Sequence, residues 1–405
     1  VPMWKKVHHD YFLEGKLELL DVPGEWFFDR ENTDMYFMPP LGSNPNDMNI
    51  RVKTMSYAFH STGGDNVHLK NVEFFATTFK FDNCEGCTVN NIGLLYPSTS
   101  KRSLGIAGED PEDRWVSRFN DCRNCSVRDS SFLYTDGSAL EMYGGNNTIE
   151  NSYFYHIDWS GADLPRVGTT ILMAGSNNLF TRNTLHKLGA SETVNPGNKA
   201  TITFNDISDT GLVQSDGAMI HLMQPQMNGA TVAHNWVHDS VKIGIRMDGP
   251  QDGSNTGHST NVHHNVIWGV NVGLMVKGDR HTIENNTVFA NCMCDTTGSQ
   301  IKNDIVVMLG GGNTKTITQN NAADKISGHR TGSYGVYPVP GEYHNNLNGY
   351  IDSGGSVESQ LTDPAAHDFR PKPGSTLDIL GMGAYESPDD PPWTAGTTSR
   401  FEFTA

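Results

Sequence analysis

The feature that most constrains the fold is a repeat of about 21 residues through the middle of the chain. Each repeat has an apolar anchor, a second defined position three residues later and an apolar residue five residues later. The anchors are Leu69, Val89, Val127, Ile149, Phe180, Ile202, Val232, Val262, Ile283 and Ile317, and the later apolar residues are Phe74, Leu94, Phe132, Phe154, Leu185, Ile207, Val237, Ile267, Val288 and Ala322. Four of the intervals between anchors are 20–22 residues and the other five are 30–38. A constant period with occasional insertions predicts a solenoid whose coils carry loops.

The position three residues after each anchor indicates what kind of solenoid this is. In order along the chain it holds Val72, Ile92, Ser130, Ser152, Asn183, Asn205, Asn235, Asn265, Asn286 and Asn320. Asn accommodates the left-handed backbone of tight turns, and its amide can bond the Asn stacked above or below it. The pattern predicts an all-β fold, a right-handed parallel β-helix of about ten coils. An antiparallel sandwich is the alternative.

A second strand precedes each anchor. It occupies Leu140–Gly144, Ile171–Gly175, Ile220–Met223, Ile245–Gly249, Leu274–Gly278 and Val306–Gly310. The first and third residues of each segment are apolar and are expected inside, so the second and fourth should point outward. The repeat anchored at Ile202 does not align in this strand.

The ends of the chain lack the repeat. Residues 1–55 contain Glu25–Asp29 and Met35–Met38, which predict a β-hairpin that leads into the first coils. The parallel β-helix is expected over 56–324, and residues 325–405 should form a C-terminal cap and tail, with Gly381–Glu386 as the last strand. Such caps are needed because the end of a solenoid exposes an unpaired strand edge.

Four cysteines repeat with the coils. Cys84 and Cys87 occupy the same slots before one anchor that Cys122 and Cys125 occupy before the next. Stacked coils therefore predict disulfides Cys84–Cys122 and Cys87–Cys125, or else a buried stack of free thiols. A four-cysteine zinc site is the rival hypothesis. The pairing of Cys292 and Cys294 is left open.

Composition narrows the partners and the compartment. The net charge of −17 argues against nucleic acid, since phosphate binding needs a basic surface. No run of about 18 apolar residues is present, so no membrane span is expected. The chain begins at Val1, which we interpret as a processed or truncated product. Sequons at Asn124, Asn146 and Asn285 predict glycosylation, and the protein is expected to be secreted to the extracellular space.

The outward positions of the strand before each anchor gather charge. His221, Arg246, Asp248 and Lys277 should cluster on one face over three neighbouring coils. Further residues that we expect to bind substrate, on flanking loops or the same face, are Asp216, His238, Asp239, Trp236, Trp268 and Glu141. A face walled by loops makes a groove for an extended polymer. The alternative interpretation of the charged residues is a solvated ion-pair face, and that of the tryptophans is packing without ligand binding.

Three chemistries are compatible with this cluster. A glycoside hydrolase needs two carboxylates, with Asp248 as the first and Asp279, Asp216 or Asp239 as candidates for the acid. A polysaccharide lyase or epimerase would use Lys277 as base with Arg246 or His221 assisting, and with a bound Ca²⁺ as a further option, although no other metal or cofactor is expected. The only weak calcium signal is Asp252, Gly253 and Asn255. The third hypothesis is a non-catalytic structural, adhesion or glycan-binding protein that self-assembles or packs on neighbouring domains.

Several segments resemble right-handed β-helix carbohydrate-active enzymes. They are Pro23–Asn32 with Met35–Pro39, His234–Asp239 with Gly244–Asp248, Asp368–Pro371, and Gly383–Glu386, all of which look like segments of β-helix glycoside hydrolases, including β-xylosidase-like ones. This resemblance implies a polysaccharide or oligosaccharide partner and a nucleophile role for Asp248. The stretch Lys277–His281 with Asn285 and Asn286 also resembles a coil of β-helix alginate and chondroitin lyases, which usually carry Arg where this chain has Lys277. A glycoside hydrolase is the leading hypothesis.

Overall fold

The structure is a computed structural model. It describes residues 13, 15–29, 31–98, 116–159, 169–189, 192–213, 216–223, 226–249, 257–290, 304–330, 337–353 and 355–403. Cys292, Cys294 and the weak calcium segment of Asp252, Gly253 and Asn255 lie outside these residues.

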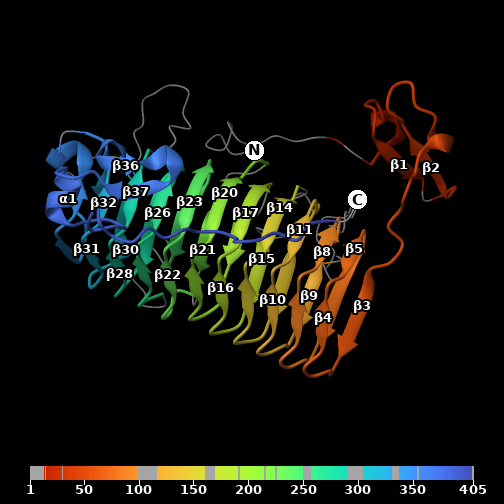
Figure 1. Cartoon of the computed structure of the whole chain (residues 1–405), viewed down its shortest axis with the longest axis horizontal. Helices are drawn as coiled ribbons and strands as arrows, with labels where there is room; N and C mark the ends of the chain where they lie inside the picture. Colours follow the sequence, from red (N-terminus) through yellow and green to blue (C-terminus); the bar gives the residue numbers. More distant parts are fainter. Residues whose placement is uncertain are drawn as a thin grey trace.

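Three parallel sheets of eleven strands each run the length of the molecule, and each coil contributes one strand to every sheet (Figure 1). The first sheet holds the anchors and consists of β4 His68–Lys70, β7 Thr88–Asn90, β10 Ser126–Arg128, β13 Thr148–Glu150, β16 Leu179–Thr181, β19 Thr201–Thr203, β22 Thr231–Ala233, β25 Asn261–His263, β28 Thr282–Glu284, β31 Ile317–Gln319 and β34 Glu342–His344. The second sheet consists of β5 Glu73–Phe75, β8 Gly93–Leu95, β11 Ser131–Leu133, β14 Tyr153–Ile157, β17 Thr184–Leu188, β20 Asp206–Thr210, β23 Trp236–Ser240, β26 Val266–Trp268, β29 Thr287–Phe289, β32 Ala322–Ala323 and β35 Leu347–Asn348. The third sheet consists of β3 Tyr57–Thr62, β6 Thr78–Asp82, β9 Ser117–Asn120, β12 Leu140–Tyr143, β15 Thr169–Ala174, β18 Glu192–Asn195, β21 Ala218–Met223, β24 Ile243–Asp248, β27 Val272–Gly278, β30 Ile305–Gly312 and β33 Ile326–Ser327.

The predicted parallel β-helix is therefore confirmed, with corrections in its last coils. Ile283 pairs with Thr318, so the last anchor is Thr318 rather than Ile317, and the stacked asparagine is Asn321 rather than Asn320. In the third sheet Leu274 pairs with Ile305, which shifts that strand by one residue from its predicted alignment. The coil that did not align is completed by β18, where Val194 pairs with Ile171 and Ile220. Strands continue to Asn348 instead of stopping at residue 324.

A ladder of buried asparagine side chains joins the coils at the turn between the first and second sheets. Its members are Asn183, Asn205, Asn235, Asn265, Asn286, Asn321 and Asn346. Asn205 is typical: its backbone N–H and its Nδ2 both donate to Oδ1 of Asn235 one coil on, and its Nδ2 also donates to the carbonyl of anchor Phe180 one coil back. Ser152 and Ser130 extend the ladder with hydroxyls.

The left-handed backbone at this turn belongs to a different residue from the one predicted. The residues with positive φ are those immediately before each ladder position: Arg182, Phe204, His234, His264, Asn285, Asn320 and Asn345. Asn is therefore required in the ladder for its amide, which both donates and accepts, and not for its backbone tolerance.

The predicted disulfides are wrong. Cys84, Cys87, Cys122 and Cys125 are free thiols, all buried inside the first coils. Each thiol bonds backbone carbonyls instead, as Cys84 does with Asp82 and Cys122 with Asn120, both at 3.2 Å. The free-thiol stack, our alternative hypothesis, is what the structure contains.

The predicted glycosylation sites differ in accessibility. Asn124 and Asn146 are exposed at turns. Asn285 is 5% exposed and its Nδ2 donates to Glu386 in the C-terminal cap, so a glycan cannot be accommodated there in the folded chain.

The two ends of the solenoid differ (Figure 1). The predicted hairpin is present, with β1 Trp26–Asp29 paired to β2 Asp34–Phe37. At the other end lie the antiparallel pair β36 Leu361–Asp363 and β37 Asp368–Pro371 and the helix α1 Thr376–Leu380, while Gly381–Glu386 is irregular and not the predicted last strand. The short helical turns are Leu17–Leu19, Pro45–Asp47, Gly349–Ser353, Val357–Gln360 and Pro364–Ala366. No helix in the described ranges is long and apolar enough to cross a membrane.

The last residues form a strap that runs back along the solenoid toward its N-terminal coils (Figure 1). Trp393 contacts Trp236, Thr397 bonds Thr184, and Phe401 bonds Ser131 through its backbone. The strap therefore covers the beginnings of the second-sheet strands.

Replacing Asn235 by Ala should destabilise the fold strongly. The change removes the acceptor for the backbone N–H and Nδ2 of Asn205 and the donor for the Ile202 carbonyl, all of them buried. Buried polar groups left without partners cost about 1–3 kcal/mol each, so we expect a loss of about 2–4 kcal/mol in the free energy of unfolding by urea denaturation. The control Asn46→Ala, in an exposed turn, should stay within about 0.5 kcal/mol of the parent. Equal stability of the two variants would contradict a structural role for the ladder.

Candidate functional site

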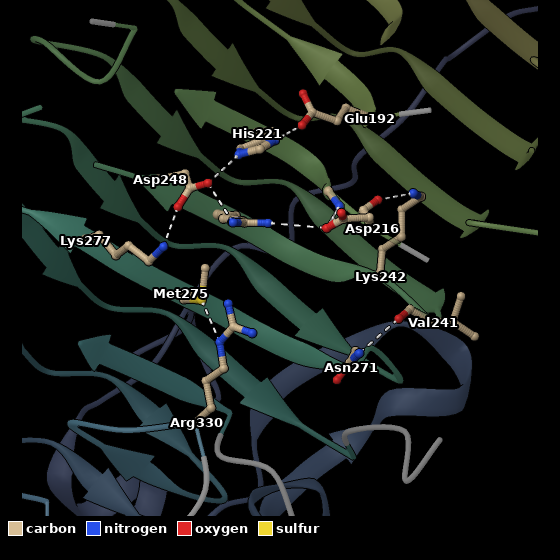
Figure 2. A network of polar contacts seen from close by, with 12 residues as sticks. Glu192, Asp216, His221, Val241, Lys242, Asp248, Asn271, Met275, Lys277 and Arg330 are labelled. Carbon is tan, nitrogen blue, oxygen red and sulfur yellow. Dashed lines mark hydrogen bonds and ion pairs between the residues drawn. The ribbon is translucent and has the colours of Figure 1, made fainter. Parts of the chain in front are cut away.

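A charged cluster lies on the outer face of the third sheet, on β21, β24 and β27. The register places His221 beside Arg246 and Met223 beside Asp248, while Met247 pairs with Val276 and so sets Lys277 next to Asp248. The four residues predicted to cluster are brought together, as Figure 2 shows.

Asp248 is the centre of this cluster. One of its carboxylate oxygens accepts a hydrogen bond from Lys277 Nζ at 2.6 Å, and the other accepts one from Arg246 Nη2 at 2.6 Å. Burial alone would raise the pKa of this carboxyl, but His221, Lys277 and Arg246 outweigh it and hold the pKa of Asp248 well below its usual range. The side chain is 19% exposed, so an ionised carboxylate remains accessible to a ligand.

His221 lies between two carboxylates. Its Nδ1 is 2.5 Å from Glu192 Oε1, and its Nε2 is 3.7 Å from Asp248 Oδ2. Burial alone would lower the pKa of His221, yet the two carboxylates raise it above the ordinary value. Within the described residues neither ring nitrogen has a well-aligned hydrogen bond, although both face acceptors. The ring is 3% exposed and is therefore positioned behind Asp248 rather than beside a ligand.

Asp216 borders the cluster on the side of Arg246. Its Oδ1 is 3.9 Å from Arg246 Nη1, and its backbone carbonyl accepts a hydrogen bond from the fully buried Lys242. At 37% exposure Asp216 is the most accessible acid of this group. Asp216 and Asp248 thus contact different terminal nitrogens of the Arg246 guanidinium, Nη1 and Nη2 respectively.

Two residues of the cluster were missed by the sequence analysis. Glu192 belongs to the coil that did not align, so its face could not be assigned. Arg330 follows β33, beyond the predicted end of the helix, and its Nε donates to Met275 Sδ at 3.2 Å (Figure 2). Burial and the charge of Arg246 lower the pKa of Arg330.

Two further predicted residues, Asp279 and Glu141, make their contacts outside the cluster. Asp279 lies in the turn after β27, where Oδ1 accepts from the Lys315 backbone and Oδ2 from the Thr314 hydroxyl. Burial would raise the pKa of Asp279, but these donors lower it, so a proton-donor role is not supported. Glu141 is buried several coils away and pairs with Arg118 at 2.7 Å.

The remaining predicted binding residues lie on the second sheet and not at the cluster. Trp236 and Trp268 pack beneath the C-terminal cap, with Phe369 centred 5.6 and 4.9 Å from their rings. His238 stacks on Trp268 at 4.1 Å and contacts Asp239 and Asp206. These four residues are therefore not brought to the cluster: the tryptophans pack against Phe369, and His238 and Asp239 form an ion pair beside them.

No group of three or more His, Cys, Asp or Glu in the described part of the chain is arranged to hold a metal ion. The four buried thiols therefore do not support the rival zinc hypothesis.

The fold and the site together define a class, a parallel β-helix with a charged cluster on one sheet. Residues 118–288 match the family model for right-handed β-helix regions, which agrees with the predicted handedness. No curated protein matches the chain.

Solved structures with a similar fold include two alginate lyases and a glycoside hydrolase. A PL6 alginate lyase in complex with a trisaccharide is 13% identical with a TM-score of 0.35, and the match covers 66% of this chain and 68% of that one. An alginate lyase in complex with G6 is 13% identical with a TM-score of 0.34, covering 65% and 66%. The glycoside hydrolase is 11% identical with a TM-score of 0.32, covering 66% and 55%.

The stability contributed by His221 should depend on pH. Its folded-state pKa is raised, so the imidazolium stabilises the fold below the unfolded value near 6.5, and this contribution is lost as pH rises through the folded pKa. We expect the difference in unfolding free energy between the parent and His221→Gln to be largest near pH 5.5 and to shrink in alkaline solution. Urea denaturation at several pH values checks this, and a pH-independent difference would contradict it.

Proposed function

We propose that the protein is an extracellular glycoside hydrolase that binds a polysaccharide or oligosaccharide across the third sheet and cleaves it at Asp248. The observation that carries this proposal is an ionised, accessible carboxylate with two further carboxylates close by. A hydrolase needs such a pair because one carboxyl group protonates the leaving oxygen while the other activates water or attacks the sugar.

The contacts at the site limit how far apart the carboxylates are. The two nitrogens of an imidazole are about 2 Å apart, so Glu192 Oε1 lies no more than about 8.5 Å from Asp248 Oδ2. Through the Arg246 guanidinium, a similar limit of about 9 Å holds for Asp216 and Asp248. Both limits are compatible with the separation of about 6.5–9.5 Å typical of inverting glycosidases.

Asp248 and Asp216 are assigned the chemical roles. Asp248 acts as the base, because Lys277 and Arg246 keep it ionised. Asp216 is assigned the proton donor because, at 37% exposure against 7% for Glu192, it is the neighbouring carboxylate that a bound sugar can reach. Glu192 and His221 are positioning residues that hold Asp248 from behind.

A polysaccharide lyase is the second candidate. The observation in its favour is that four basic residues converge here, namely His221, Arg246, Lys277 and Arg330, as neutralising a uronate carboxylate requires. Against it, Lys277 is 5% exposed and its Nζ donates a hydrogen bond to Asp248, so this nitrogen is directed at the carboxylate and not at a substrate proton.

Replacing Asp248 by Asn should abolish hydrolysis. The amide cannot act as a base, so reducing-sugar release from a panel of neutral and anionic polysaccharides should fall by at least about a thousandfold, a typical loss for a principal catalytic group. Asp121→Asn, at an exposed left-handed turn that Asn tolerates, is the matched control and should keep full activity. Unchanged activity in the Asp248 variant would contradict the proposal.

The same panel separates the two chemistries. Elimination creates an unsaturated sugar that absorbs near 235 nm, whereas hydrolysis does not. We expect reducing ends without this absorbance. Absorbance that is lost in Lys277→Ala would establish the lyase instead, and inactivity of the parent on every polysaccharide would favour a non-catalytic protein.

A further inference from the structure

An exposed row of aromatic side chains lies on the second sheet, away from the charged cluster. It consists of Phe75, Tyr96, Tyr134, Tyr155 and His186, which come from five consecutive coils and are called the aromatic strip below. The distances between successive ring centroids are 5.8, 5.7, 5.7 and 5.8 Å. The strip therefore runs parallel to the solenoid axis and repeats once per coil.

The strip is open over most of its length. Phe75, Tyr96 and Tyr134 are 42%, 48% and 38% exposed, and Tyr155 and His186 are half-buried. Phe75, Tyr155 and His186 belong to one column of the sheet, and Tyr96 and Tyr134 lie one residue beyond it, at the turns after β8 and β11. Later in that column come His238, Trp268 and Phe289, of which the last two pack against the cap residue Phe369. An uncovered row of large rings on a soluble scaffold marks a binding surface more often than chance exposure does.

The chemistry of the strip indicates its ligand. Tyr and His present an apolar ring face together with a polar edge, as the C–H faces and hydroxyl groups of a pyranose require. A ring that recurs once per coil matches a polymer that repeats along its own axis. The Arg51 guanidinium lies over the Phe75 ring at 4.9 Å and Lys187 Nζ over the Tyr155 ring at 5.8 Å, so a cation occupies one face of each of these two rings, and Tyr96 and Tyr134 form the open middle of the strip.

We propose that the aromatic strip is a second glycan-binding site, at which a polysaccharide chain lies along the solenoid axis with its pyranose rings against Phe75, Tyr96, Tyr134, Tyr155 and His186. The choice of a glycan over other ligands rests on the proposed function, but binding at the strip does not require catalysis. The site holds a polymer on the protein while the third sheet acts on it.

The first test is affinity electrophoresis of the full chain in gels that contain neutral or acidic polysaccharides. The parent and the inactive Asp248→Asn variant should both be retarded by at least one polymer, and Tyr96→Ala/Tyr134→Ala should weaken that binding about tenfold. Tyr96→Phe/Tyr134→Phe keeps the rings and should stay within about threefold of the parent. The control Trp26→Ala, on the exposed N-terminal hairpin, should bind like the parent.

Retardation by acidic polymers alone would indicate that Arg51 and Lys187 contribute to recognition. Retardation by neutral polymers would indicate that ring stacking is sufficient. Either result supports the site. Parent-like binding by the double Ala variant, or no retardation of the parent by any polymer, overturns it. If Asp248→Asn binds the polysaccharide but does not cleave it, the binding at the strip is independent of catalysis, and the two proposals can fail separately.

A second measurement uses the unmodified chain and does not depend on how the variants fold. Hydroxyl-radical footprinting read by mass spectrometry should show protection of Tyr96 and Tyr134 by the bound polysaccharide, and no protection of Tyr36, which is 38% exposed on the hairpin. Equal oxidation of Tyr96 and Tyr134 with and without the polymer would overturn the proposal.

Discussion

The stack of buried asparagine amides is the interaction on which the rest of the structure depends. Each amide oxygen accepts hydrogen bonds from the backbone N–H and the amide of the ladder residue one coil back, and each amide nitrogen donates to the anchor carbonyl one coil back. The turn between the first two sheets therefore closes with these polar groups paired. Because the same atoms are used in every coil, neighbouring coils can only stack with their ladder positions aligned. The ladder thereby fixes the register of all three sheets, even where loops of different length separate the coils.

The charged site is a consequence of that register. Side chains alternate between faces along a strand, so a slip of one residue would move Asp248 from the outer face into the core. With the register fixed, His221, Arg246 and Lys277 from three strands meet around one carboxylate. Charges this buried are costly unless each is paired, and here every carboxylate faces at least one cation. The charged cluster needs a rigid backbone, because each of its side chains can be paired in only one arrangement.

The repeat made the fold and the core of the site predictable, because period and alternation are local properties of the chain. The prediction failed where geometry is not periodic. In the last coils the anchor and the third-sheet strand were each placed one residue off, since an apolar neighbour, Ile317 beside Thr318 and Val306 beside Ile305, also fits the pattern. Glu192 was hidden in a coil with an irregular strand. The disulfides failed for a different reason: stacking places the cysteines in adjacent coils, but their thiols turn to carbonyl oxygens within the coil. Asp279 was a candidate because it lies one coil on from Asp248, but it follows the turn at Gly278 and its carboxylate bonds Lys315 and Thr314 instead.

On the second sheet, whether an aromatic side chain packs or is open to a ligand depends on whether the C-terminal cap covers it, more than on its residue type. One column of this sheet continues from Tyr155 and His186 through Ser208 to His238, Trp268 and Phe289. The tryptophan looked like a sugar platform from the sequence, yet it is the C-terminal part of this column that β37 covers, through Phe369. The strap then crosses only the beginnings of the strands, at Thr184 and Ser131, and leaves the N-terminal rings open. The C-terminal cap thus covers the later rings of this column, and the strap passes beside the earlier ones, so the C-terminal residues leave uncovered the aromatic strip that we propose as a glycan site.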